Sequence, residues 1–389
     1  MKSLTWHEVC RRRLERQYLS ETAPGTDMAG AVGAVCGIQA QIITAAELAI
    51  GARVAGVTQE DVRTALWETR SLVKTYGPRS TLHLLPANEL PMWMAAMRAR
   101  ALLQDPPWFK SAGLEPAQVR ALLEGIGEAL DGKQLTREEL ASEVSSLVGG
   151  WAKERLSSTW GELLSPAAFE GLLCFGPSKG SKVTFVRADQ WIGTWQEVDP
   201  DAALAEVARR YLATYGPATH REFARWFWID PAESKRIIES LGSDIVQVDF
   251  ENHRAWVLAS DVDTPVNLPR KEADETSVRL LPQYDVYVLG SGPRERIVGE
   301  VAHKRIFSYG RGRFEGAAGL PILLVDGEVS GIWERKMRGK TVDIRVEPFI
   351  GLTPAQRRQL EVEAARIGKF LGSETNLSVG TLGDTTNPN

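Results

Sequence analysis

The sequence predicts a mixed α+β protein in which one helical motif occurs three times before a β-rich, barrel-like region. In three successive parts of the chain, apolar residues at helical spacing precede a pair of β-prone stretches. After Pro265, short β-prone runs separated by turn residues replace the helical spacing. The chain has 389 residues, of which 43% are hydrophobic and 25% are charged, so it is long enough for two or three domains with proper cores.

The first repeat covers residues 1–112. Helical spacing and a capping sequence that begins at Thr58 predict three helices, over residues 4–19, 28–55 and 62–69. Two β-prone stretches then flank a Gly-Pro pair and predict a hairpin, with strands over residues 71–76 and 80–85.

The second repeat, residues 113–198, has the same order. Helical spacing and a capped segment around Thr136 predict helices over residues 115–130, 135–141 and 154–173. A strand pair around a Gly-Pro-Ser-Lys-Gly turn closes the repeat, with strands over residues 174–175 and 182–186. Its second helix carries two acids and one base in the first turn, a poor surface for phosphates, so this repeat is equally well interpreted as a scaffold.

Residues 199–264 form the clearest repeat. After a predicted helix over residues 202–215, Thr219 is placed to cap a second helix. A third helix begins with Asp230 as its N-cap and a proline at the first helical position. Two strands follow, over residues 244–249 and 255–258. Three helices followed by a β-hairpin is the order of a winged helix, so we predict three winged helices in tandem.

The β-rich region is predicted over residues 265–371. Its candidate strands are short β-prone runs, at residues 278–281, 285–289, 322–325, 329–333 and 342–346. They suggest a small barrel or an antiparallel sheet, followed by a helix over residues 354–371. Residues 372–389 are rich in Ser, Thr, Asn and Gly, so we expect a flexible tail.

The charge distribution favours a polyanion as partner more than the net charge does. The net charge of −4 argues mildly against nucleic-acid binding. However, residues 294–313 contain six Lys and Arg residues plus His303, against two Glu residues, and a second basic cluster follows at residues 335–340. Either cluster alone is interpreted equally well as part of a solvated surface. Two clusters in one region favour a surface that faces a polyanion.

Several classes of protein are disfavoured by what the sequence lacks. The polar N-terminus does not resemble a signal peptide, and no apolar run reaches the roughly 20 residues of a membrane span. The three cysteines, Cys10, Cys36 and Cys174, are widely separated and have no metal-ligand spacing. We therefore expect a cytoplasmic protein without a metal site or a membrane partner.

The polar feature that stands out is the tripeptide Gln39-Ala40-Gln41, which lies in an otherwise apolar run. An amide side chain in apolar surroundings is costly unless its donors and acceptors are used. Nothing else in the sequence resembles an active site. These two amides are therefore the candidate catalytic residues. The alternative is a pair of structural glutamines, one buried and bonded to the backbone and the other exposed.

Four motifs, in the right order, resemble those of the AlkZ/YcaQ superfamily of winged-helix DNA glycosylases over residues 1–371. They are Gln-Ala-Gln at 39–41, Arg-Ser-Thr-Leu-His-Leu at 79–84, Leu-Leu-Pro-Gln-Tyr-Asp at 280–285 and Asp-Gly-Glu-Val-Ser-Gly-Ile-Trp at 326–333. The second glutamine is typical of the AlkZ-like branch. Ser80 stands where the family pattern has Gly, a departure expected to stiffen the wing or to narrow the space beneath it.

The resemblance implies tandem winged helices in a C-shape around damaged double-stranded DNA. It also implies hydrolysis of the N-glycosidic bond of a modified purine without a cofactor. Some members protect producers of DNA-alkylating natural products by acting on bulky N7-alkylguanines or by unhooking crosslinks. We expect a monomer that acts in base excision repair and self-resistance.

The two amides fit this chemistry if the substrate base is cationic. A purine alkylated at N7 or N3 already carries a positive charge and leaves without protonation. Gln39 and Gln41 would then position water and stabilise an oxocarbenium-like sugar through oriented dipoles. Residues i and i+2 do not share a face of a helix, so residues 37–41 are predicted to form a loop or bend. No lysine stands beside them, so we expect a monofunctional glycosylase without lyase activity.

Two segments are candidates for contacts with DNA. The first wing offers Arg79, Ser80, Thr81 and His83, although His83 is equally well a structural core residue. The segment 303–313 mixes basic, aromatic and glycine residues and is predicted to form a hairpin that enters a groove, or a plain β-hairpin edge. Its candidate contacts, with one residue upstream, are Arg294, His303, Lys304, Arg305, Arg311 and Arg313.

Two interpretations remain open from the sequence alone. Asp285 is either a carboxylate of the site or an Asp in a turn. The alternative function is a non-catalytic winged-helix DNA-binding protein or transcription regulator. A regulator should bind one sequence tightly as a dimer, whereas a glycosylase should bind damage with little sequence preference and release free base.

Overall fold

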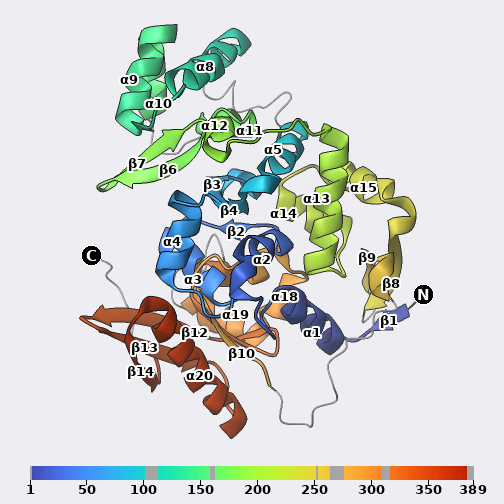
Figure 1. Ribbon diagram of the computed structural model, residues 1–389. Helices are drawn as coiled ribbons and strands as arrows, with labels where there is room; N and C mark the ends of the chain where they lie inside the picture. The colour runs from blue at the N-terminus through green and yellow to red at the C-terminus, as the bar shows by residue number, and fades with distance from the viewer. Residues whose placement is uncertain are drawn as a thin grey trace. The chain divides into compact units, whose positions relative to one another are not determined.

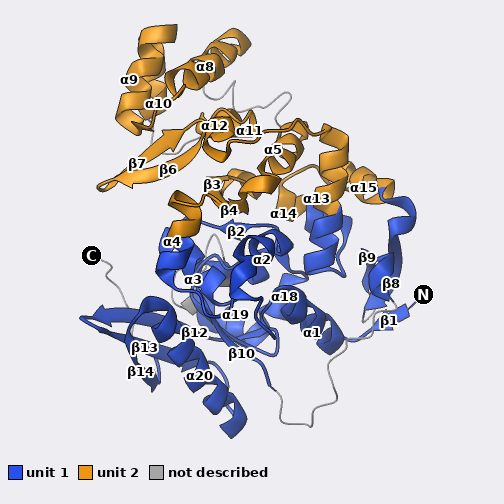
Figure 2. Ribbon diagram, in the orientation of Figure 1, with its two compact units in different colours: residues 1–62, 209–223, 241–389 blue, residues 63–208, 224–240 orange. Residues whose placement is uncertain are grey.

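The computed structural model describes residues 2–100, 113–157, 163–250, 253–262, 276–308 and 316–382 (Figure 1). It confirms the predicted mixture of helices and sheets. The chain forms two compact units (Figure 2). Unit 1 contains residues 1–62, 209–223 and 241–389, and unit 2 contains residues 63–208 and 224–240. Three helices run from one unit into the other, and they are α4 (Gln59–Trp67), α13 (Pro200–Tyr215) and α14 (His220–Phe227).

The N-terminal part of unit 1 is helical. After the short strand β1 (Lys2–Leu4), three helices follow, which are α1 (Trp6–Arg16), α2 (Met28–Ala34) and α3 (Ile43–Gly51). Between α2 and α3 lies the two-residue strand β2 (Ile38–Gln39). The single helical pattern predicted over residues 28–55 is therefore interrupted, as the predicted bend at residues 37–41 requires.

A three-stranded sheet in unit 1 joins distant parts of the chain. Strands β8 (Ile245–Phe250) and β9 (His253–Leu258) form the predicted antiparallel hairpin. Strand β1 pairs in parallel with β8, with Lys2 opposite Val248. The helix α16 (Ala259–Val262) follows the hairpin.

The C-terminal sheet has five strands in the order β10-β11-β12-β13-β14 and curls into a half-barrel, not a closed barrel. Its strands are β10 (Val278–Leu281), β11 (Ile322–Val325), β12 (Glu328–Arg338), β13 (Thr341–Pro348) and β14 (Glu374–Val379). All neighbours are antiparallel except β13 and β14. The helix α20 (Pro354–Leu371), capped by Thr353, packs against β10 and β14.

One hydrophobic core unites the two ends of unit 1. Leu4, Val9 and Leu14 from the N-terminal segment share it with Ile322 and Ile332 of the C-terminal sheet. Burial of these apolar side chains away from water is the main stabilising contribution in such a core. The N-terminal helices and the C-terminal sheet are therefore held as one body.

Unit 2 contains two β-hairpins and most of the remaining helices. Strands β3 (Leu72–Tyr76) and β4 (Leu82–Pro86) form one hairpin, and β6 (Cys174–Lys179) and β7 (Lys182–Val186) form the other, to which β5 (Leu135–Thr136) adds a third strand. Its helices are α5 (Leu90–Ala99), α8 (Pro116–Ala129), α9 (Arg137–Val148), α10 (Trp151–Ser157), α11 (Leu164–Phe169), α12 (Ala188–Ile192) and α15 (Pro231–Ser240).

The order of helices followed by a hairpin occurs in all three predicted repeats. The cap predictions are confirmed, because Thr58 pairs with Asp61, Thr219 pairs with Glu222, and Asp230 accepts a hydrogen bond from Ala232 N. Whether each repeat packs as a winged helix stays a prediction, as do the domain boundaries at residues 112, 198, 264 and 371.

Four predicted elements are wrong. The helix predicted over residues 154–173 is two helices, α10 and α11, because Pro166 has no N–H and fits only the first turn of a helix. Residues 286–290 form the helix α17 (Val286–Gly290) instead of a strand. The residues expected in a frayed tail include β14, which pairs with β13. Residues 300–308 form the helix α19 (Glu300–Ser308) instead of a hairpin, after the short helix α18 (Arg294–Ile297).

Candidate active site and DNA-contacting residues

The two candidate glutamines lie in the bend between α2 and α3. Helix α2 ends at Ala34, and the next residues reverse the chain, with φ of 63° at Cys36 and 86° at Gly37. Gln39 is the last residue of β2, and Gln41 lies in a bend before α3 begins at Ile43. The prediction that these residues leave helical geometry is confirmed.

The two amides differ in their surroundings. Gln39 is only 6% exposed, whereas Gln41 is exposed to solvent. A buried amide acts in a low dielectric, where its dipole is strong, and an exposed amide is open to water and to a ligand. One buried and one exposed glutamine is also the arrangement that the structural alternative predicts.

Asp285 belongs to a buried ion pair with Arg53, which follows α3. Its two carboxylate oxygens accept hydrogen bonds from Arg53 Nη1 at 2.8 Å and Nη2 at 2.7 Å, and both side chains are 1% exposed. Arg53 Nη1 also donates to Ala49 O in α3, and Asp285 accepts from Tyr287 N as the cap of α17. Both carboxylate oxygens are therefore engaged within the fold. The structure supports the interpretation of Asp285 as a turn and cap residue.

A buried carboxylate that sequence reasoning missed lies on α3. Glu47 is 2% exposed, and its Oε2 accepts a hydrogen bond from Gln59 Nε2 at 2.6 Å. Burial lowers the pKa of Arg335 on β12, and the attraction of Glu47 opposes that shift. The signal in the sequence is one acid within the apolar run 43–50. Glu47 thus places a negative charge six residues after Gln41, close to one member of the second basic cluster.

The four wing residues make hydrogen bonds within unit 2. Arg79 is half-buried and donates to Trp226 O at 2.9 Å. The Ser80 hydroxyl accepts from Arg100 Nη2 at 3.3 Å, and Thr81 Oγ1 donates to Pro78 O at 3.0 Å. Arg79 and Ser80 both have left-handed backbone, with φ of 59° and 55°. These contacts fix the shape of the turn.

His83 is a core residue of the hairpin. Its side chain is 2% exposed, and Nδ1 donates to Thr81 O at 2.9 Å. Burial, with a smaller contribution from the charge of Arg79, lowers the pKa of His83 to about 3. The imidazole is therefore neutral near pH 7 and has no exposed face for a phosphate. The structure supports the core interpretation that the sequence had left open.

The candidate basic residues of the C-terminal region lie on two helices. Arg294 at the start of α18 and His303, Lys304 and Arg305 on α19 are all exposed. On α19 the His303 ring stacks on the 59% exposed ring of Phe307. Arg311 and Arg313 lie outside the described residues. Helix α19 thus presents basic and aromatic side chains together on an exposed surface.

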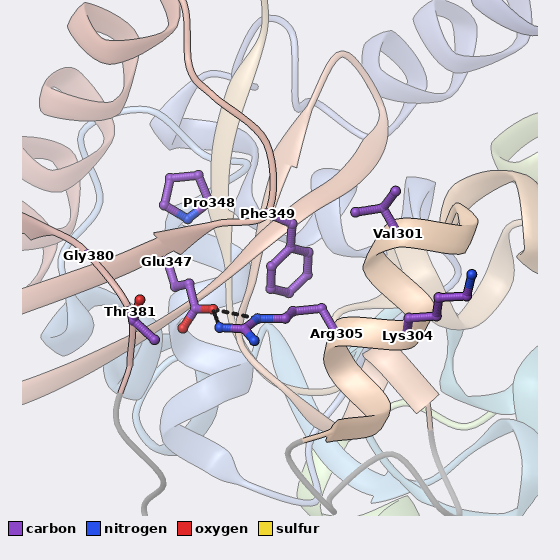
Figure 3. A pocket seen from close by; sticks show the side chains of 8 residues that line it. All are labelled: Val301, Lys304, Arg305, Glu347, Pro348, Phe349, Gly380 and Thr381. Carbon is purple, nitrogen blue, oxygen red and sulfur yellow. Dashed lines mark hydrogen bonds and ion pairs between the residues drawn. The ribbon is translucent and has the colours of Figure 1, made fainter.

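A cavity of about 640 Å³ lies beside α19 (Figure 3). Val301, Lys304 and Arg305 line one side, and Glu347 and Phe349 line another. Figure 3 shows Arg305 turned toward Glu347, and its Nη2 donates to Glu347 Oε1 at 2.7 Å. The other oxygen, Oε2, accepts from Leu382 N at 2.6 Å. Arg305 is thus partly neutralised within the fold, whereas the more exposed Lys304 pairs with the exposed Glu300 on α19.

The second basic cluster forms the tip of a true hairpin. Residues 335–340 cover the end of β12 and the turn to β13, with Arg338 opposite Thr341. Met337 at this tip is 49% exposed. A basic hairpin therefore exists at residues 328–348, whereas the described residues of the segment 303–313, up to Ser308, are helical.

In the described part of the chain, no group of three or more His, Cys, Asp and Glu side chains is arranged to hold a metal ion. No described helix is long and apolar enough to cross a membrane.

Comparisons with known proteins agree with one another. The family model described as "DNA glycosylase AlkZ-like" matches residues 32–370. The chain is 32% identical over 375 residues to the interstrand DNA cross-link repair glycosylase of Streptomyces sahachiroi, which covers 95% of this chain and 97% of that protein. Among solved structures, it is similar to the Streptomyces sahachiroi DNA glycosylase AlkZ, with a TM-score of 0.84 and 31% identity over 98% of this chain and 100% of the other.

Proposed function

The chain belongs to the AlkZ-like DNA glycosylase family and is a DNA glycosylase, and we propose that its substrates are cationic purines alkylated at N7 or N3. The observation that carries this proposal is the bend that removes Gln39 and Gln41 from helical geometry. Neither amide titrates, so the pair has no proton to give to a leaving base. A substrate that already carries a positive charge needs none.

In the proposed reaction, Gln39 and Gln41 act on water and on the sugar. As the bond between the sugar and the cationic base lengthens, positive charge moves to the sugar, and the amide oxygens stabilise it. The same pair orients the water that attacks the anomeric carbon. The buried Gln39 supplies a fixed dipole, and the exposed Gln41 lies where water and DNA have access. The electron pair of the broken bond goes to the base, which leaves as a neutral molecule, and the attacking water loses a proton to solvent. The products are the free base, an abasic site and that proton.

We propose that DNA contacts come from tandem winged helices and from the basic surfaces of unit 1. The tip of the β12–β13 hairpin, residues 335–340, supplies cations and the exposed Met337. The exposed residues of α18 and α19 add further candidate phosphate contacts, which are Arg294, His303, Lys304 and Arg305. The aromatic ring of Phe307 is available for stacking.

The scope is proposed to include bulky N7-alkylguanine adducts and crosslinks, as expected for self-resistance against genotoxic natural products. The support is the relative from Streptomyces sahachiroi, whose name gives interstrand DNA cross-link repair as its activity. We expect a monofunctional, cytoplasmic monomer that needs no cofactor. We further expect large adducts to be excised without full base flipping, because they would not enter a snug pocket.

The test is release of free base from defined duplexes. Purified protein is incubated with duplexes that carry N7-methylguanine, a bulky N7-alkylguanine or an N7-to-N7 interstrand crosslink. Free base is measured by mass spectrometry, and abasic sites by alkaline strand cleavage. We expect release from all three, with single-strand products from the crosslink. No release from any of them, together with tight binding of one undamaged sequence, would favour the regulator.

A base-flipping control uses a complex with bulky-adduct DNA. A structure in which the adducted base sits in a closed protein cavity would contradict excision without flipping, while leaving the glycosylase assignment intact.

A separate test addresses the cofactor. Removal of metal ions with a chelator should leave the rate of base release unchanged.

A further inference from the structure

Two side chains on α13 hold the turn that precedes the candidate catalytic glutamines. Thr214 Oγ1 lies 2.6 Å from Ala34 O, and Tyr215 OH donates to Val35 O at 2.9 Å. These carbonyls lie at the end of α2, where a helix leaves C=O groups without partners of its own. All four residues belong to unit 1.

The Thr214 hydroxyl is part of a short chain of contacts. It also lies 2.9 Å from Arg210 O on its own helix, and its single proton serves one carbonyl at a time. The shorter distance favours Ala34 O. On its other side, Cys36 Sγ lies 3.6 Å from Thr214 Oγ1. The hydroxyl therefore contacts both the last helical residue and the first reversed residue of the turn.

The turn needs such support because its backbone is unfavourable. Cys36 has a φ of 63°, which is sterically costly for a residue with a Cβ, and Gly37 follows with 86°. Cys36, Thr214 and Tyr215 are each only 1% exposed, so water does not replace their contacts. The left-handed pair directs the chain away from α2 and into the segment that carries both glutamines.

The helix α3, which follows the glutamines, is also held just beyond its C-terminal end. Arg53, just after α3, is paired with Asp285, which caps α17. Helix α17 ends at Gly290, where a Cβ would lie 2.3 Å from Tyr215 Cε1. The ring of Tyr215 thus packs directly on α17. Tyr215 therefore holds the turn before the glutamines, and it also contacts α17, the helix whose cap residue Asp285 pairs with Arg53 just after α3.

From this geometry we propose that Thr214 and Tyr215 are positioning residues for the glycosylase reaction, which rests on the proposed role of Gln39 and Gln41. Amides that act through oriented dipoles depend on their placement, because they cannot compensate by ionising. A displacement of about 1 Å can cost about 100-fold in rate. Loss of an anchor should therefore lower the rate of base release while leaving the DNA-binding surfaces of α19 and the β12–β13 hairpin unchanged.

The first test is Tyr215→Phe, which removes the hydroxyl and keeps the ring against Gly290. Its matched control is Tyr287→Phe in the same unit, where a fully buried hydroxyl donates to Gly327 O, also at 2.9 Å. Single-turnover release of N7-methylguanine should fall about 10- to 100-fold in Tyr215→Phe. The dissociation constant for the duplex should stay within about two-fold, because no phosphate contact is removed. Tyr287→Phe should retain the wild-type rate.

The second test uses the threonine. Thr214→Val removes the hydroxyl at nearly constant shape and should slow the reaction, and Thr214→Ser should restore most of the rate because it returns the hydroxyl. Equal rate loss in Tyr215→Phe and Tyr287→Phe would overturn the proposal. So would weakened DNA binding at an unchanged single-turnover rate, or a Thr214→Ser variant as slow as Thr214→Val.

The outcomes separate this inference from the proposed function. If Gln39→Ala and Gln41→Ala release base as fast as wild type, the proposed function itself is wrong. If those variants are inactive and both α13 variants have the wild-type rate, only the positioning role is wrong.

Discussion

Two reversed turns of this protein, one before Gln39 and one at Arg79, have similar backbones but different uses of their side chains. Each contains two consecutive left-handed residues, Cys36 and Gly37 in the first and Arg79 and Ser80 in the second. In the first, Thr214 and Tyr215, which lie outside the Gln-Ala-Gln motif, bond to carbonyls of the turn. In the second, the motif residues themselves donate or accept the bonds that fix it.

This difference distinguishes two kinds of motif. The side chains of Gln-Ala-Gln are proposed to act in catalysis, whereas those of the wing turn fix the conformation of its backbone. In the wing turn, Arg79, Thr81 and His83 bond to backbone carbonyls of unit 2. Substitutions there should therefore change stability first. Around the glutamine bend, the frame is built by residues distant in sequence, so substitutions of the motif should change catalysis first. The predictions below test this division, in order of decreasing effect.

The stability of the protein should be most sensitive to substitution of the buried Arg53–Asp285 pair, which links the end of α3 to α17. Asp285→Asn leaves the charge of Arg53 buried beside a neutral partner, and breaking a buried pair in this way costs about 3–5 kcal/mol. Unfolding in urea, followed by fluorescence, measures the loss. The control is Glu334→Gln, which breaks the exposed pair with Arg345 and should cost at most about 1 kcal/mol. Equal losses in the two variants would show that the buried pair does not stabilise the frame.

Substitution of either glutamine should lower the rate of base release far more than the stability of the protein. Gln41→Ala removes an exposed amide and should change the melting temperature little, while base release falls about 100- to 1000-fold. Gln39→Ala should lose as much activity, with some loss of stability because the side chain is buried. Single-turnover kinetics with N7-methylguanine DNA and thermal melting measure the two effects. A Gln41→Ala variant with the wild-type rate would support the interpretation of Gln41 as a structural residue.

The sequence predicted the elements that are specified by local signals. Thr58, Thr136 and Thr219 each precede an acid three residues later, and each begins a helix because that pairing satisfies backbone groups at the helix start. The bend at Gln39 was predicted from the spacing of two amides. The signals that predict these elements come from residues that lie within one helical turn of each other in the sequence.

Elements that depend on distant partners could not be predicted in the same way. The run Val286–Gly290 is short and apolar, and periodicity does not separate a strand from a helix at that length; the cap by Asp285 decides it. Strand β14 has weak local signals and forms because β13 offers an open edge. Likewise, Thr214 and Tyr215 are about 180 residues from the turn that they hold, and no local pattern points to them.

The buried His83 of the wing hairpin should make the free energy of unfolding depend on pH. The folded pKa of His83, about 3, lies below the unfolded value of 6.5. As the pH falls below 6.5, the unfolded state binds a proton that the folded state does not, so stability decreases by about 1.4 kcal/mol per pH unit. Between pH 6.5 and pH 5 the loss should be about 2 kcal/mol. His83→Asn cannot titrate and should lack this part of the pH dependence in urea unfolding. A variant with the same acid sensitivity as wild type would show that His83 is not its source.

Ser80→Gly should have the smallest effect, because it changes two opposing contributions. Glycine adopts the φ of 55° without the steric cost of a Cβ, which favours the variant by about 1 kcal/mol. The substitution also removes the hydroxyl that accepts from Arg100 at 3.3 Å, a loss of about 0.5–1.5 kcal/mol. The stability of the variant should therefore lie within about 0.5 kcal/mol of wild type. If Ser80 also narrows the space beneath the wing, release of a bulky N7 adduct should accelerate relative to N7-methylguanine. An unchanged ratio of the two rates would place Ser80 with the other motif residues of this turn, as a determinant of shape and not of substrate choice.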